Sequence, residues 1–234
     1  MRPNIPRDAV SVLLDIKNEF AITHFIETGT NVGQTAEWAS QQFESVTTIE
    51  MDDDLYQTAL EKRGHIENID FVKGVSQEEL RTIVPTLDGP AIFHLDAHCG
   101  GKWAASAGES LERDDLPPCP VLEEIEIIGE SEFGHYIFID DARVFASPRR
   151  EPFDMDAWPN IQDVIHEIEA IDPDYEVIIY KDEIIAVPPA GVDFVRERVR
   201  DLKSVPRTRI NRLKFKILNK VWYHASLSGP TRDY

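Results

Sequence analysis

The sequence predicts an α/β protein built on a mostly parallel, seven-stranded sheet with an antiparallel hairpin at one edge. Short β-branched runs alternate with longer stretches of helical period, which is typical of parallel sheets covered by helices on both faces. Residues 181–183 leave too little chain between the last two runs for a crossover helix, so these runs form the hairpin. The expected strands cover residues 24–27, 46–50, 69–72, 91–95, 136–139, 176–180 and 184–187.

Size and charge narrow the function classes. The chain has 234 residues, of which 42% are hydrophobic and 29% charged, enough for one buried core with appendages. The net charge of −19 argues against nucleic acid as a partner, because an acidic surface repels the phosphate backbone. There is no long apolar run and no secretory signal pattern, so we expect a cytoplasmic protein.

The carboxyl-terminal part differs in charge from the rest of the chain. Residues 193–234 contain 11 lysines and arginines against 4 acids, so we divide the chain into a catalytic-type domain, 1–192, and a basic extension, 193–234. Beyond Pro206 the extension has the pattern of a basic amphipathic helix. Three interpretations remain open: contact with the inner face of a membrane, docking between subunits of a homo-oligomer, and packing on the parent domain.

A glycine-bearing turn follows the first strand. The segment 27–35 reads ETGTNVGQT and leads into a helix. Glycines let a backbone approach a ligand closely, and a helix amino end suits a carboxylate or phosphate, although a plain tight turn would look similar. Glu50 ends the second strand, where nucleotide-binding sheets place an acid for the ribose hydroxyls. The third strand ends in a polar turn at residues 73–76.

These features resemble class I S-adenosylmethionine-dependent methyltransferases over residues 20–190. The resemblance implies a Rossmann-like, doubly wound fold with S-adenosylmethionine as cofactor. Asn31 stands where many members have a second glycine, and the pyrophosphate spacing of dehydrogenases is absent. The residues that the resemblance assigns to the cofactor are Glu27, Gly29 and Gly33 at the methionine part, Glu50 at the ribose, Gly74, Val75 and Ser76 near the adenine, and also Thr28, Thr30 and Asp96.

Acids also follow the fourth and fifth strands. Asp96 and His98 come after one, and Asp140 and Asp141 after the other. Neighbouring strand ends would gather these carboxylates, and a divalent cation that prefers oxygen ligands, Mg²⁺ or Mn²⁺, would relieve their repulsion. Alternatively, the aspartates cap loops or are solvated.

The two acidic strand ends resemble the metal-dependent, macrocin-type O-methyltransferases that act on sugars. The resemblance implies that Asp96, Asp140 and Asp141 bind the metal. His98 stands where relatives tend to carry a second acid, so it is a candidate ligand or base. We interpret His94 as a structural core residue. Arg143 either grips an anionic acceptor or pairs with the nearby acids.

The working hypothesis is a metal-dependent O-methyltransferase that acts on a hydroxyl of a sugar or glycan-like acceptor. The metal would orient and acidify the hydroxyl, and His98 or Asp96 would take its proton. Two rivals come from other classes: a non-catalytic partner protein that has kept the nucleotide-binding fold, and a metal-dependent hydrolase that uses Asp96, Asp140 and Asp141 on water.

Overall fold

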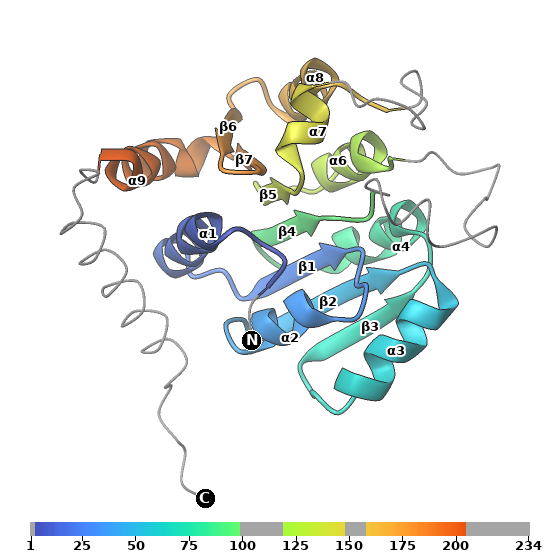
Figure 1. Cartoon of the computed structure of the whole chain (residues 1–234). Coiled ribbons are helices and arrows are strands. Elements are labelled where there is room, and N and C mark those ends of the chain that lie inside the picture. Colours follow the sequence, from blue (N-terminus) through green and yellow to red (C-terminus); the bar gives the residue numbers. More distant parts are fainter. Residues whose placement is uncertain (1–2, 99–118, 148–157, 205–234) are drawn as a thin grey trace, which may run out of the picture.

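The computed structural model describes residues 3–98, 119–147 and 158–204, which are coloured in Figure 1. These residues form a single seven-stranded sheet with helices on both faces. The expected strands are all present, and each of their bounds lies within one residue of its predicted position. The strands are β1 (His24–Thr28), β2 (Ser45–Glu50), β3 (Ile69–Lys73), β4 (Ala91–Leu95), β5 (Tyr136–Ile139), β6 (Glu176–Tyr180) and β7 (Glu183–Val187).

The strand order is β3-β2-β1-β4-β5-β7-β6. Strands β1 to β5 pair in parallel, whereas β7 runs antiparallel to both β5 and β6. This confirms the α/β, Rossmann-like, mostly parallel sheet and its antiparallel edge hairpin. The order reverses between β1 and β4, and ligands of open α/β sheets bind beyond the carboxyl ends of the strands at such a point.

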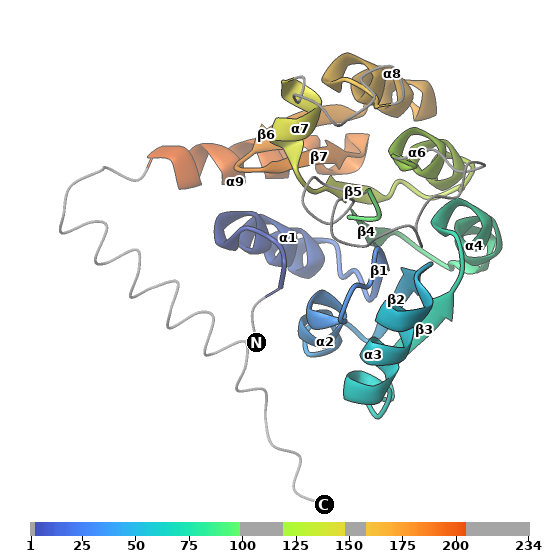
Figure 2. The same cartoon turned by 45° about the vertical axis from the view of Figure 1, so that its right-hand side comes forward.

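Helices cover the two faces in separate groups. Residues of α1, α2 and α9 pack in one core cluster, and residues of α4, α6, α7 and α8 pack in the other. Figure 2 shows α1 beside α9 on one side and α4, α6 and α8 on the other. The bounds are α1 (Arg7–Glu19), α2 (Gln34–Ser40), α3 (Asp53–Arg63), α4 (Ser76–Ile83), α6 (Val121–Gly129), α7 (Ala142–Ala146), α8 (Ile161–Ile171) and α9 (Val192–Ser204), with 3-10 turns η1 (Val84–Thr86) and η3 (Pro189–Gly191).

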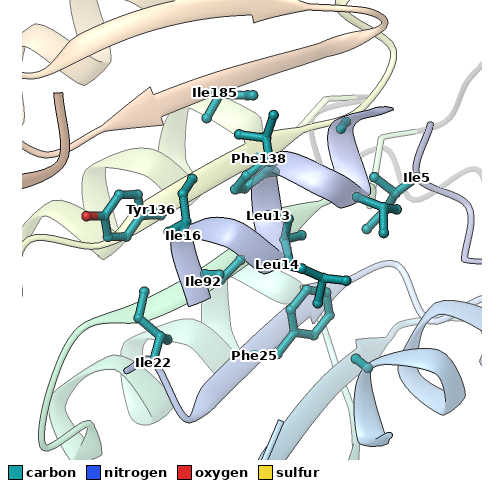
Figure 3. Close-up of a cluster of buried hydrophobic side chains, with 14 of the residues drawn as sticks. Ile5, Leu13, Leu14, Ile16, Ile22, Phe25, Ile92, Tyr136, Phe138 and Ile185 are labelled. Atoms are coloured by element: carbon teal, nitrogen blue, oxygen red, sulfur yellow. The ribbon is translucent and has the colours of Figure 1, made fainter. Parts of the chain in front are cut away.

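The apolar pattern of α1 explains where the amino-terminal segment lies. Leu13 and Ile16 are fully buried and lie over the side chains of Phe25, Ile92 and Phe138 from three neighbouring strands (Figure 3). The segment before the helix is held as well, because Ile5 is only 5% exposed. Burial of apolar surface on this scale fixes the position of the chain that precedes α1. Residues 3–6 therefore lie against the body of the protein.

Polar caps start two of the helices. Asp52 accepts a hydrogen bond from the Leu55 amide at the start of α3. Asn160 and Asp163 form a reciprocal capping box at the start of α8. Such caps satisfy amides that have no partner within the helix. The Asp52 cap places the end of β2 next to the start of α3.

The basic extension begins as part of the body. Val195 and Val199 of α9 are buried, and Arg198 pairs with Asp15 of α1. Residues 205–234, which include the predicted amphipathic helix, lie outside the described residues, so the membrane and oligomer hypotheses stay predictions. The division of the chain at residue 192 also stays a prediction. Across residues 3–98, 119–147 and 158–204, no helix is long and apolar enough to span a bilayer.

Candidate active site

The turn after β1 contains three residues with left-handed backbone. The angle φ is +85° at Gly29, +51° at Asn31 and +80° at Gly33. A Cβ atom at Gly29 would also lie 2.4 Å from the carbonyl oxygen of Asp96. Glycine tolerates both demands, and asparagine tolerates a positive φ better than most residues. Asn31 therefore preserves the turn without the second glycine, and Gly29 lets the turn lie against the chain that follows β4.

Glu50 ties this turn to the end of β2. Its Oε2 atom accepts a hydrogen bond from the Asn31 amide at 2.8 Å, and its Oε1 atom accepts one from the Asp52 amide at 2.9 Å. Burial raises the pKa of Glu50, and these backbone donors act in the opposite direction. Each carboxylate oxygen can accept a further hydrogen bond. Glu50 is thus held in place, and its oxygens keep the capacity to accept a further hydrogen bond.

Glu27 lies beneath the turn. It is 2% exposed, and its Oε2 atom accepts a hydrogen bond from the Thr48 hydroxyl at 2.8 Å. The Thr30 and Thr48 hydroxyls lie 2.7 Å apart. Burial, opposed by the Thr48 hydrogen bond, raises the pKa of Glu27 to about 8. Glu27 and Thr30 therefore belong to a buried hydrogen-bonded chain that supports the turn from the sheet.

His94 continues this buried row across the sheet. It pairs in register with Glu27 and is fully buried, in agreement with its interpretation as a core residue. Its Nδ1 atom lies 3.9 Å from Glu27 Oε1 and its Nε2 atom 4.0 Å from Glu183 Oε1. These distances are too long for hydrogen bonds. Burial, together with the nearby His98, lowers the pKa of His94 to about 3, which favours the neutral ring.

The turn after β3 lies at the same sheet edge. The Gly74 amide donates to the Glu50 carbonyl oxygen at 3.1 Å, and Val75 and Ser76 are buried at the start of α4. Glu124 of α6 is fully buried on this side, and burial raises its pKa to about 7 while the hydroxyls of Ser76 and Thr28 lower it. The turn that contains Gly74, Val75 and Ser76 therefore lies beside the end of β2.

Asp96 and Asp140 converge from β4 and β5. The side-chain nitrogen of Asn4 donates to Asp96 Oδ2 at 2.9 Å and reaches Asp140 Oδ2 at 3.4 Å. Burial and the neighbouring Asp140 raise the pKa of Asp96 to about 8. Burial raises the pKa of Asp140 to about 6, against a hydrogen bond from the Asp141 amide. The two carboxyl groups form an acidic pair joined by one amide group.

Asp141, which follows Asp140, forms an ion pair with Arg143. It has a left-handed backbone, with φ of +59°, and its Oδ1 atom lies 2.6 Å from Arg143 Nη2. Its Oδ2 atom lies 3.9 Å from the Nε2 atom of His98. Arg143 also pairs with Asp182 and leaves 57% of its side chain exposed. The ion-pair interpretation of Arg143 therefore describes its contacts, and a grip on an anionic acceptor stays a prediction.

The predicted metal centre of Asp96, Asp140 and Asp141 stays a prediction. Within the described ranges, no three His, Cys, Asp or Glu side chains are placed together to hold a metal ion. Asp96 and Asp140 offer the oxygen donors that Mg²⁺ prefers, but the Asp141 carboxylate is held by Arg143.

Three residues of this region were not among those predicted from the sequence. Asn4 is 92 residues from Asp96 and lies outside any motif. Glu183 is fully buried beside His94, and burial and the charges of Asp140, Asp96 and Asp141 raise its pKa well above the usual value. Arg63 contacts the glycine turn from α3. Of these three residues, only Glu183 has a sequence feature that could have predicted it, because it is an acid that begins a strand of otherwise buried, apolar residues.

Comparison with known proteins finds a shared fold and no sequence family. No protein-family model matches the chain, and no curated protein matches it in sequence. Solved structures do match. An O-methyltransferase from Bacillus cereus, in complex with SAH, superposes with a TM-score of 0.54 at 16% identity, covering 80% of this chain and 84% of that one.

Two further structures agree. A protein described as a caffeoyl-CoA O-methyltransferase from Staphylococcus aureus gives a TM-score of 0.54 at 14% identity, covering 80% of this chain and 85% of its own. An SAH-bound methyltransferase from Podospora anserina gives 0.50 at 14% identity, covering 78% and 77%. The chain therefore has the fold of these methyltransferases.

Proposed function

We propose that this protein is an S-adenosylmethionine-dependent methyltransferase that acts on a hydroxyl oxygen of a sugar or glycan-like acceptor. The observation that carries the proposal is the Gly29–Gly33 turn held by Glu50, placed at the same sheet edge as the Asp96–Asp140 pair. The fold shared with two SAH-bound methyltransferases supports it. The sugar-like acceptor comes from the sequence resemblance alone.

In the proposed reaction the bond from sulfur to methyl breaks as the bond from the acceptor oxygen to methyl forms. S-adenosylmethionine supplies the electrophilic methyl group when bound. Asp96 takes the hydroxyl proton, and a carboxyl group whose pKa is raised to about 8 is better matched to this task than an ordinary aspartate. The products are a methyl ether, S-adenosylhomocysteine and a protonated carboxyl group.

His98 is the alternative to Asp96 as the base that takes the hydroxyl proton. Its Nε2 atom lies 3.9 Å from Asp141 Oδ2. No step is routed through a metal. The dependence on Mg²⁺ or Mn²⁺ stays a prediction from the sequence.

The test is transfer of a tritiated methyl group from S-adenosylmethionine to a panel of nucleotide sugars and glycans, with and without Mg²⁺ or EDTA. The proposal expects a labelled methyl ether with at least one acceptor, and loss of label with the Asp96→Asn variant. Binding of S-adenosylhomocysteine without transfer to any acceptor would favour the non-catalytic rival. Hydrolysis without S-adenosylmethionine would favour the hydrolase.

A further inference from the structure

Arg63, the last residue of α3, is buried beside the glycine turn. Its side chain is only 8% exposed, which is rare for arginine because a buried guanidinium must recover its lost hydration through hydrogen bonds. The proposed reaction gives Arg63 no chemical role. Its position therefore needs another explanation.

Arg63 contacts the turn and the start of α2. Its Nη1 atom donates to the carbonyl oxygen of Val32, and its Nε atom donates to Glu37 Oε2 at 2.7 Å. Its Cδ atom lies 2.9 Å from the place that a Cβ atom on Gly33 would take. The guanidinium therefore joins the turn to α2, while the aliphatic part of the side chain packs against Gly33.

Arg63 and Glu50 hold consecutive residues of the turn. Glu50 accepts from the Asn31 amide, and Arg63 donates to the Val32 carbonyl oxygen. A turn with positive φ at Asn31 and Gly33 has many alternative conformations when it is free, and ordering it during binding would reduce affinity. Contacts that already fix its peptide groups remove that cost.

We propose that Arg63 is a positioning residue for the methyl-donor site, an inference that rests on the proposed function. It keeps the turn in the conformation that receives the donor, without touching the donor itself. The role needs a planar fork with donors in fixed directions, which lysine does not offer. Arg63→Lys should therefore restore only part of what Arg63→Met loses.

The test is calorimetric titration of S-adenosylhomocysteine into the full chain. We expect Kd to rise at least tenfold for Arg63→Met and by a smaller factor for Arg63→Lys. The matched control is Arg81→Met, which removes an exposed arginine that pairs with Glu123 and Glu130; its Kd should stay within twofold of wild type.

A second control separates positioning from general loss of stability. Ile168→Val trims a buried side chain of α8, on the other face of the sheet, and should lower Tm while leaving Kd unchanged. If Arg63→Met does not fold, Arg63→Lys carries the test with an expected rise in Kd of at least threefold.

The outcomes separate the two proposals. Wild-type protein that binds S-adenosylhomocysteine while the folded Arg63 variants bind it equally well would overturn the role of Arg63 alone. Wild-type protein that does not bind S-adenosylhomocysteine would overturn the proposed function, and this inference with it.

Discussion

The two halves of the candidate site differ in how their polar groups are satisfied. On the side of β1 and β2, both oxygens of Glu50 accept backbone hydrogen bonds, and Glu27 accepts one from Thr48. On the side of β4, β5 and β7, Asn4 is the hydrogen-bond partner that joins Asp96 to Asp140, and the carboxyl group of Glu183 is buried without a hydrogen bond. In the first half, Glu50 and Glu27 are held by hydrogen bonds within the protein itself. The second half concentrates acids that repel one another.

This difference suits a two-substrate reaction. A preformed site for the larger cofactor lowers the entropic cost of binding it. A cluster of acids whose pKa values are raised by burial and by one another can accept a proton near neutral pH. Substitutions on the β1 side are therefore expected to change the stability of the fold and the affinity for the methyl donor. Substitutions on the β4 side are expected to change the charge of the acid cluster.

The largest effect is expected at Gly29. Replacing it with alanine forces a side chain into positive φ and into contact with the Asp96 carbonyl oxygen, so the free energy of unfolding should fall by about 2–4 kcal/mol. Urea denaturation measures this. Gly89→Ala is the matched control, because a Cβ atom there would meet nothing within 4 Å. Equal stability of the two variants would show that the turn is not rigid.

The next effect is a pH dependence of stability. The pKa is raised to about 8 at Glu27 and at Asp96, so the folded state binds these protons more tightly than the unfolded state. Their contribution is full below the ordinary carboxyl pKa and is lost as pH rises towards 8. The lowered pKa values of His94 and His135, about 3 and 4, act in the opposite direction only below about pH 6.5.

Between pH 6.5 and 8.5 the free energy of unfolding should therefore decrease, on the order of 1 kcal/mol per pH unit. Urea titrations across this range measure the slope. Glu27→Gln cannot titrate at this position and should reduce the slope by roughly half, because Asp96 still contributes. Glu67→Gln, at an exposed acid, should leave the slope unchanged. A wild-type stability that is constant or increases over this range would contradict the assigned charge states.

The sequence was sufficient to predict the sheet, its edge hairpin and the positions of most candidate site residues. Strand runs and strand-end residues are local features, and the parallel topology brings strand ends together whatever lies between them. The direction in which a side chain points is not determined by such a local pattern. The left-handed backbone of Asp141, for example, is not indicated by the strand pattern that placed this residue at the end of β5.

Contacts between segments far apart in the chain were also beyond sequence patterns. Asn4 reaches Asp96 and Asp140 because Ile5 and α1 pack on the sheet, and no motif records that packing. Arg63 reaches the glycine turn from the far end of α3. Pairings of this kind become visible only when the elements are assembled.

The smallest of the three stability effects is expected at Asn4. Asn4→Asp replaces the donor between Asp96 and Asp140 with a third carboxylate, so the free energy of unfolding at pH 8.5 should fall by about 0.5–1 kcal/mol. Chemical denaturation measures it. Gln57→Glu adds the same charge at an exposed position of α3 and should change stability by less. A fully stable Asn4→Asp protein would mean that the second half tolerates added charge.

Hydrogen exchange of the wild-type protein with and without S-adenosylhomocysteine tests the central claim most directly. Exchange reports the local opening of each backbone amide. We predict slower exchange on binding at residues 28–34, 50–52 and 74–77, with the amides of α8 unchanged. Protection confined to other parts of the chain, or no protection at a saturating concentration, would contradict a methyl-donor site at the carboxyl ends of β1, β2 and β3.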